Sequence, residues 1–79
     1  MADISAKFRN NYSVNGMCTV WDVGRDPGNP PIVFQDRLDS GAETDWITLN
    51  GEGNVMYQRP EGGQTIPMTV HDGDTVPMD

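Results

Sequence analysis

The chain has one cysteine, one lysine and one histidine among its 79 residues, and it has no long apolar run. Cys18 cannot form a disulfide within the chain, which favours a reducing compartment over the stapled folds of small secreted domains. His71 alone cannot supply a three-histidine zinc site, and no apolar run reaches the 18 residues of a membrane span. We therefore expect a cytoplasmic protein with no membrane span, no metal site and no cofactor. Export by a leaderless route and removal of a leader both stay open.

Basic residues are scarce as well. The chain has five of them and twelve acidic residues, which gives a net charge of -7. Residues 1–37 are neutral overall, whereas residues 38–79 carry eight acids and only Arg59. Nucleic-acid binding requires clustered Lys and Arg to neutralise phosphates, so the composition excludes nucleic acid as a partner. The acidic surface favours solubility, and it also suits a basic partner or divalent cations.

Residues that favour helices are few. Leu and Ala together number 5, whereas Val, Ile and Thr number 17, which favours strands. Nine glycines and six prolines at short intervals would interrupt any helix longer than about three turns. Alternation of apolar and polar residues, bounded by turn signals, predicts strands at 3–10, 17–23, 32–38, 44–49, 54–59, 64–70 and 75–78.

This pattern predicts a single all-β domain over residues 1–79, built as a small antiparallel β-sandwich or barrel of six to seven short strands. The alternation in 32–38 groups Ile32 with Phe34 and Leu38 on one face. Pro67 cannot donate a hydrogen bond to a neighbouring strand, so its strand is expected at an edge or with a bulge.

Three Asn-Gly or Asp-Gly pairs predict hairpins, because these residues readily adopt the positive φ angles of a tight turn. The strands on either side of each pair are therefore expected to be antiparallel neighbours. The longer loops at 24–31 and 39–43 have room to cross between two sheets, as in a Greek key. The three predicted hairpin turns are Asn15-Gly16, Asn50-Gly51 and Asp72-Gly73.

Enzymatic chemistry has little support in this sequence. The three serines lie in no nucleophile motif that His71 could complete. Cys18 lies in an apolar segment with no basic neighbour to stabilise a thiolate, which predicts a small core residue. We therefore expect a protein that is not an enzyme.

Acidic residues cluster in residues 36–45 and again at Asp72 and Asp74. Neither cluster has the spacing of an EF-hand loop, since the third position from Asp36 is Leu38. Calcium also binds sandwich loops that lack this motif. A solvated acidic loop is the favoured interpretation, and calcium binding is an alternative.

The candidate binding residues are aromatic: Trp46, Tyr57 and Trp21. Trp46 and Ile47 are consecutive in a strand, so their side chains point to opposite faces. If Ile47 and Leu49 enter the core, Trp46 faces out beside Tyr57, and the two rings can form a platform for a sugar or a protein anchor. Trp21 presents the same choice, and a core position is the favoured interpretation for it.

We expect a non-enzymatic interaction module that binds a protein partner, or a second copy as a homo-oligomer, through a sheet face or edge. A chain of this length buries only about 60% of its unfolded surface, and several strands are apolar on both faces. Association would then complete a thin core. The alternative is a carbohydrate- or calcium-binding sandwich that uses Trp46 and Tyr57 or the acidic loops.

Overall fold

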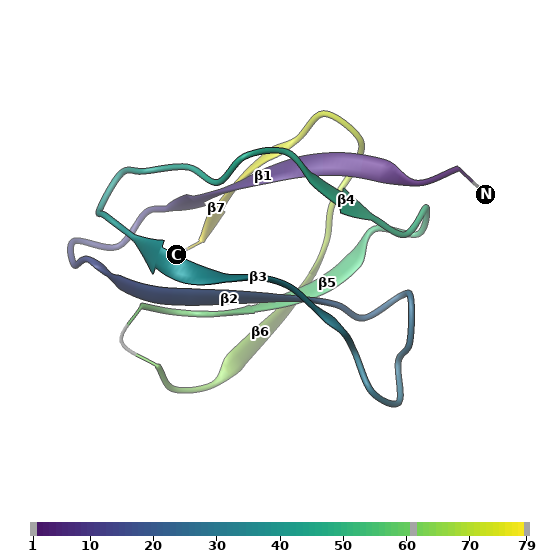
Figure 1. Cartoon of the computed structure of the whole chain (residues 1–79), viewed down its shortest axis with the longest axis horizontal. Coiled ribbons are helices and arrows are strands. Elements are labelled where there is room, and N and C mark those ends of the chain that lie inside the picture. The colour runs from purple at the N-terminus through teal and green to yellow at the C-terminus, as the bar shows by residue number, and fades with distance from the viewer. Residues whose placement is uncertain (1, 61, 79) are drawn as a thin grey trace.

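The computed structural model describes residues 2–60 and 62–78, and it confirms the predicted all-β fold (Figure 1). None of the described residues forms a helix that could span a membrane. The predicted strands are present, although the fourth is shorter than expected. The strands are β1 (Ile4–Asn10), β2 (Gly16–Asp22), β3 (Ile32–Leu38), β4 (Ile47–Leu49), β5 (Asn54–Gln58), β6 (Thr65–Thr69) and β7 (Thr75–Met78).

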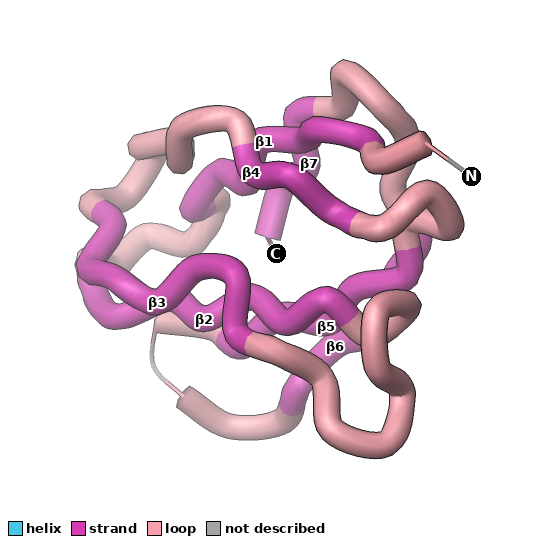
Figure 2. The backbone as a smooth tube through the Cα atoms, turned by 45° about the vertical axis from the view of Figure 1, so that its right-hand side comes forward, coloured by secondary structure: helices cyan, strands magenta, loops and turns pink. Residues whose placement is uncertain are grey.

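The strands form two sheets that lie one above the other (Figure 2). One sheet has the order β4-β1-β7 and the other the order β3-β2-β5-β6. All paired strands are antiparallel except β1 and β7, which are parallel. The two sheets share no strand pairing in the described part of the chain, so the fold is an open, sandwich-like pair of sheets. As Pro67 predicts, β6 is an edge strand.

The core lies between the two sheets. Phe8, Leu49 and Met78 are fully buried side chains of the three-stranded sheet. Val20 and Val55 face them from the four-stranded sheet and are equally buried. These positions follow the period-two alternation of each strand, and the predicted inward face of β4, with Ile47 and Leu49 in the core, is confirmed.

The three predicted hairpins are wrong, because each turn connects strands of opposite sheets. The chain changes sheets after β1, β3, β4 and β6, and three of these connections contain the Asn-Gly or Asp-Gly pairs. The predicted crossing at 39–43 is confirmed. The loop at 24–31 instead joins the paired strands β2 and β3 as a hairpin.

The Asn15-Gly16 pair has a packing role in this fold and does not form a hairpin turn. Its φ is not positive, and it is the first residue of β2. A Cβ at Gly16 would lie 2.8 Å from the carbonyl oxygen of Pro60 and 2.9 Å from its Cβ. The side-chain Oδ1 of Asn15 accepts a hydrogen bond from the backbone N of Ser40 at 2.7 Å. Glycine is therefore needed for close approach, and Asn15 ties two sheet crossings together.

Each sheet edge carries a feature that disfavours pairing with another chain. In the three-stranded sheet, β4 has only three residues and β7 contains Pro77. In the four-stranded sheet, β6 contains Pro67, and β3 carries the exposed charges Asp36 and Arg37 together with an irregular register. These edges favour association through a sheet face over association through an edge.

Candidate functional site

The structure places the three predicted aromatic residues in three different environments. Trp46 precedes β4 and is 54% exposed, which confirms that it faces outward. Tyr57 lies in β5, in the other sheet, and is only 3% exposed. The predicted platform of Trp46 and Tyr57 is therefore wrong, because Tyr57 shares the inward face of β5 with Val55.

The exposed ring of Trp46 contacts a side chain of its own sheet. The Nζ atom of Lys7 lies 4.8 Å from the centroid of the Trp46 ring. A cation over an aromatic face is attracted by the negative charge density of the ring. Lys7 therefore lies over one face of the Trp46 ring.

The alternation around Trp46 gives a direct test of the strand phase. Ile47→Ala is expected to lower the free energy of unfolding by about 2–5 kcal/mol, because it leaves a cavity between the sheets. Trp46→Ala should lower it by about 1 kcal/mol or less, since it removes an exposed ring and one cation–π contact. Denaturant unfolding of both variants measures the difference. The opposite ranking would contradict the observed phase of β4.

Trp21 lies on the outer face of the four-stranded sheet, which corrects its predicted core position. Its neighbours in β2, Val20 and Asp22, point inward and are fully buried, so Trp21 points outward and is half-buried. Register places three further apolar residues beside it, one in each of the other strands of the sheet. We call this line of side chains the apolar row: Ile32, Trp21, Met56 and Pro67.

The apolar row exposes surface to solvent and is flanked by uncharged polar residues. Ile32 is 51% exposed, Pro67 is exposed and Met56 is half-buried. The adjacent row consists only of Gln and Thr side chains, and in it Gln35 Nε2 donates to Thr19 Oγ1 at 3.5 Å. The members of this polar row are Gln35, Thr19, Gln58 and Thr65.

The outer face of the four-stranded sheet carries almost no charge in a chain of net charge -7. Among the described strand residues that point outward from this sheet, Arg37 is the single charged one, and it pairs in register with Met17. Met17 is 54% exposed. Protein interfaces are depleted in Asp, Glu and Lys at their centre and enriched in Trp, Met and Arg. The outer face has this composition.

An open pocket of about 480 Å³ lies at one end of the same face, between the β2–β3 loop and strands β5 and β6. Its lining is mostly apolar, and its polar side chains bond to one another: Asn54 Oδ1 accepts from Thr69 Oγ1 at 3.2 Å, and Asn54 Nδ2 donates to Glu52 Oε2 at 3.3 Å. Because Pro67 belongs to both the pocket and the apolar row, the two are continuous. The pocket is lined by nine residues: Val23, Gly24, Pro27, Glu52, Asn54, Val55, Pro67, Met68 and Thr69.

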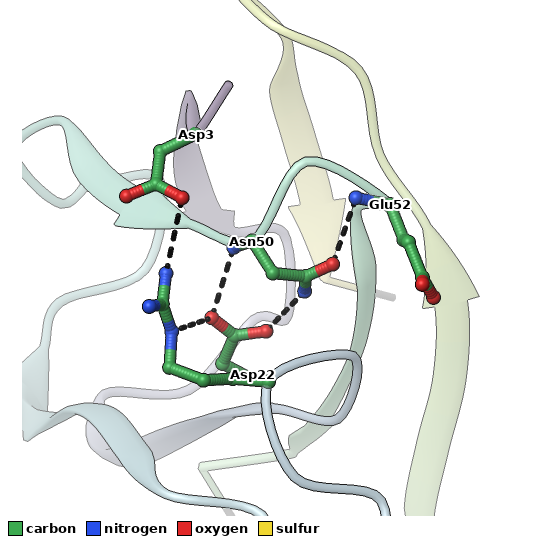
Figure 3. Close-up of polar contacts among 5 residues, drawn as sticks. Asp3, Asp22, Asn50 and Glu52 are labelled. Carbon is green, nitrogen blue, oxygen red and sulfur yellow. Dashed lines mark hydrogen bonds and ion pairs between the residues drawn. The ribbon is translucent and has the colours of Figure 1, made fainter. Parts of the chain in front are cut away.

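A buried carboxylate fixes the walls of this pocket (Figure 3). Asp22 is fully buried, and its Oδ2 accepts hydrogen bonds from the backbone N of Asn50 at 3.0 Å and from Arg25 Nε at 3.1 Å. Its Oδ1 accepts from the side-chain Nδ2 of Asn50. Asn50 Oδ1 in turn accepts from the backbone N of Glu52 at 2.8 Å. One network thus positions both the β2–β3 loop and Glu52.

Arg25 completes this network at the surface. Its Nη2 lies 3.4 Å from Asp3 Oδ1, so the guanidinium bridges a buried and an exposed acid. The hydrogen bond to Asp22 and the charge of Asp3 raise the pKa of Arg25, which stays charged at any physiological pH. Asp22 and Asn50 were missed as structural residues by the sequence patterns, because one lies in an apolar strand and the other resembles a hairpin turn.

The other candidate groups have structural roles. Asp72 Oδ1 accepts from the backbone N of Ser5 at 2.9 Å, and Asp74 Oδ2 accepts from the backbone N of His71 at 2.9 Å. Among the described residues, no three His, Cys, Asp or Glu side chains gather in a group that could hold a metal ion. Cys18 is fully buried, which confirms its core position, and burial raises the pKa of its thiol.

Comparison with known proteins gives no relative on which to base a function. No family model matches the chain, and neither curated proteins nor solved structures show significant similarity to it. The outer face of the four-stranded sheet and its pocket are therefore the candidate functional surface.

Proposed function

We propose that this chain is a non-enzymatic interaction module that binds a protein partner through the outer face of the four-stranded sheet. One observation carries the proposal: the apolar row crosses all four strands on a face where Arg37 is the single charged strand residue described. The rest of the chain has a strong acidic excess, so this face stands apart from the remaining surface.

A sheet face is favoured over a sheet edge for this contact. An edge binds an extended segment through its free backbone groups, and short strands, prolines and charges work against such pairing. Pro67 and Pro77 each remove one backbone donor from an edge strand. The outer face has no comparable obstacle, because its side chains are apolar or uncharged except for Arg37.

A protein partner is favoured over a carbohydrate. The two-ring sugar platform of Trp46 and Tyr57 is not formed because Tyr57 lies in the core, and Lys7 lies over one face of the remaining Trp46 ring. Trp21 is half-buried between Ile32 and Met56, which makes it part of a broad apolar surface. Such a surface suits the packing of another protein.

Site-specific photo-crosslinking tests the proposal. A benzophenone amino acid replaces Gln35, which is exposed on the outer face of the four-stranded sheet, in the full chain produced in living cells. The matched control carries it at Thr48, which is exposed on the outer face of the other sheet and likewise lies in an edge strand. We expect discrete protein adducts at position 35 and few at position 48.

Both kinds of adduct, to this chain and to other proteins, count in favour of the outer face as a protein-binding surface. Equal adduct yields at positions 35 and 48 would contradict the proposal, because the outer face would then have no preference as a contact surface. Adducts at position 48 alone would move the binding surface to the three-stranded sheet.

A further inference from the structure

We infer that the pocket receives an arginine side chain of the partner, which forms an ion pair with Glu52 while the apolar residues beside that arginine cover Pro67 and the apolar row. This inference rests on the proposed function and specifies the chemistry of its partner. The partner is then a protein that presents an arginine within an exposed apolar segment.

Glu52 is the charged group of the pocket, and it is available to a cation from outside the chain. Of the nine lining residues, only Glu52 carries a charge. Each ion pair among residues 2–60 and 62–78 involves Arg25 or His71, and none of them includes Glu52. The carboxylate accepts a hydrogen bond from Asn54 Nδ2 at 3.3 Å, which leaves acceptor capacity on both of its oxygens. A cation that enters the pocket therefore meets an acid for which no described base competes.

The buried Asp22 network holds Glu52 in place before any partner binds. The backbone N of Glu52 donates to Asn50 Oδ1 at 2.8 Å, and Asn50 is itself held by Asp22. Figure 3 shows the Glu52 side chain extending away from the buried carboxylate of Asp22. An acid whose backbone is already fixed loses less conformational freedom on binding, which favours affinity.

The charges around the pocket favour a basic partner. Four acids and one base lie in the network or in the adjoining β2–β3 loop, so this end of the molecule is negative. Arg37, the charged strand residue of the outer face, lies beside Met17 at the opposite end of β2. A negative potential at the pocket steers a positive group toward it. The five charged residues are Asp3, Asp22, Arg25, Asp26 and Glu52.

Arginine fits this pocket better than lysine does. The walls are mostly apolar, and a guanidinium is more weakly hydrated than an ammonium, so it loses less when it is partly buried. Its planar fork can also donate two hydrogen bonds to one carboxylate. Interface centres are accordingly enriched in arginine and depleted in lysine. The volume of about 480 Å³ leaves room for the aliphatic part of the side chain against Pro27 and Pro67.

The apolar row accounts for the residues beside the arginine. Pro67 belongs to both the pocket and the row, and it pairs in register with Met56. A partner segment with its arginine in the pocket therefore sets its next side chains over Pro67 and Met56. Apolar side chains at these positions would remove the exposed surface of the row from water.

An NMR titration of the ¹⁵N-labelled full chain with two capped tripeptides tests the inference. One is acetyl-Leu-Arg-Leu-amide, and in the other citrulline replaces arginine, which keeps the shape and removes the charge. The arginine peptide should bind about fivefold or more tightly, because only it forms charge-assisted hydrogen bonds with Glu52. The backbone signals of Gly24, Asn54 and Thr69 should move, since these residues line the pocket.

Glu52→Gln should reduce this preference for arginine to about twofold or less, because the glutamine keeps the acceptor for Asn54 but not the charge. Glu43→Gln is the matched control: it makes the same change in net charge at an exposed residue between β3 and β4, and it should keep the preference. The spectrum of each variant also shows whether it is folded.

Equal affinity of the unmodified chain for the two peptides, or an unchanged preference in Glu52→Gln, would overturn the ion pair. Signals at the pocket that do not move up to about 10 mM peptide would overturn the site itself. Tighter binding of acetyl-Leu-Lys-Leu-amide would overturn arginine as the occupant. The proposed function fails separately: crosslinks from position 35 to other proteins would keep the outer face as a binding surface even if the pocket takes no arginine.

Discussion

Replacing Asp22 with alanine is expected to lower the free energy of unfolding by about 3–5 kcal/mol. The substitution leaves two donors of Asn50, its backbone N–H and its side-chain amide, without their acceptor. Asn50 is only 9% exposed, and each buried donor left unsatisfied costs about 1–3 kcal/mol. Small domains have a total stability of about 5–15 kcal/mol, so the loss is a large share of it. Urea unfolding followed by tryptophan fluorescence measures the change.

Asp3→Ala is the matched control for this substitution, because it removes the other acid that contacts Arg25. The Asp3 side chain is 53% exposed, and its ion pair with Arg25 is 3.4 Å long. Exposed pairs of this kind contribute about 0–1 kcal/mol, so Asp3→Ala should change stability little. Equal losses for Asp22→Ala and Asp3→Ala would contradict a structural role for the buried carboxylate.

The Asp22 network also shows why the sheet crossings could not be predicted from sequence. Asp22 and Asn50 are 28 residues apart, and a pattern within one strand carries no information about such a partner. Asn10 behaves similarly: its Nδ2 donates to the carbonyl oxygens of Val14 at 2.9 Å and Leu38 at 3.0 Å. Asparagines beside the sheet crossings thus form hydrogen bonds with backbone groups that have no partner strand. In the sequence, Asn50-Gly51 looks the same as the turn of a hairpin.

Local alternation predicted a different part of the fold correctly. It placed Ile47 and Leu49 in the core and Trp46 outside it, since each position depends on neighbours within one strand. The missing backbone donor of Pro67 separately predicted an edge strand. Which strands pair depends on contacts between distant segments. The parallel pairing of β1 with β7 joins the two ends of the chain, and no turn signal points to it.

The candidate site was only partly accessible to sequence reasoning. Trp21 was a candidate binding residue. The other members of the apolar row, Ile32, Met56 and Pro67, can be placed beside it only when the register of all four strands is known. Ile32 was expected on the same face as Phe34, whereas the register shift at Val20/Trp21 pairs Ile32 with Trp21 on the outer face. The same irregularity lets Val33 pack against the core. A bulge inserts one residue and so reverses the alternation beyond it.

Gly53→Ala is expected to lower the free energy of unfolding by about 3–5 kcal/mol. Gly53 has a φ of 72°, and a left-handed conformation costs a residue with a Cβ about 1–2 kcal/mol. A Cβ at this position would also lie 2.0 Å from the carbonyl oxygen of Val70, so the backbone must shift. Overpacking of this kind adds about 1–3 kcal/mol. The shift would strain the 2.9 Å hydrogen bond from Val70 N to Gly53 O, and chemical denaturation measures the combined loss.

Gly41→Ala separates the two contributions, because Gly41 has a φ of 84° but no atom lies within 4 Å of the place that its Cβ would occupy. Its loss should be only about 1–2 kcal/mol, the contribution of the left-handed backbone alone. Equal losses for the two variants would mean that Gly53 and Val70 do not approach each other closely.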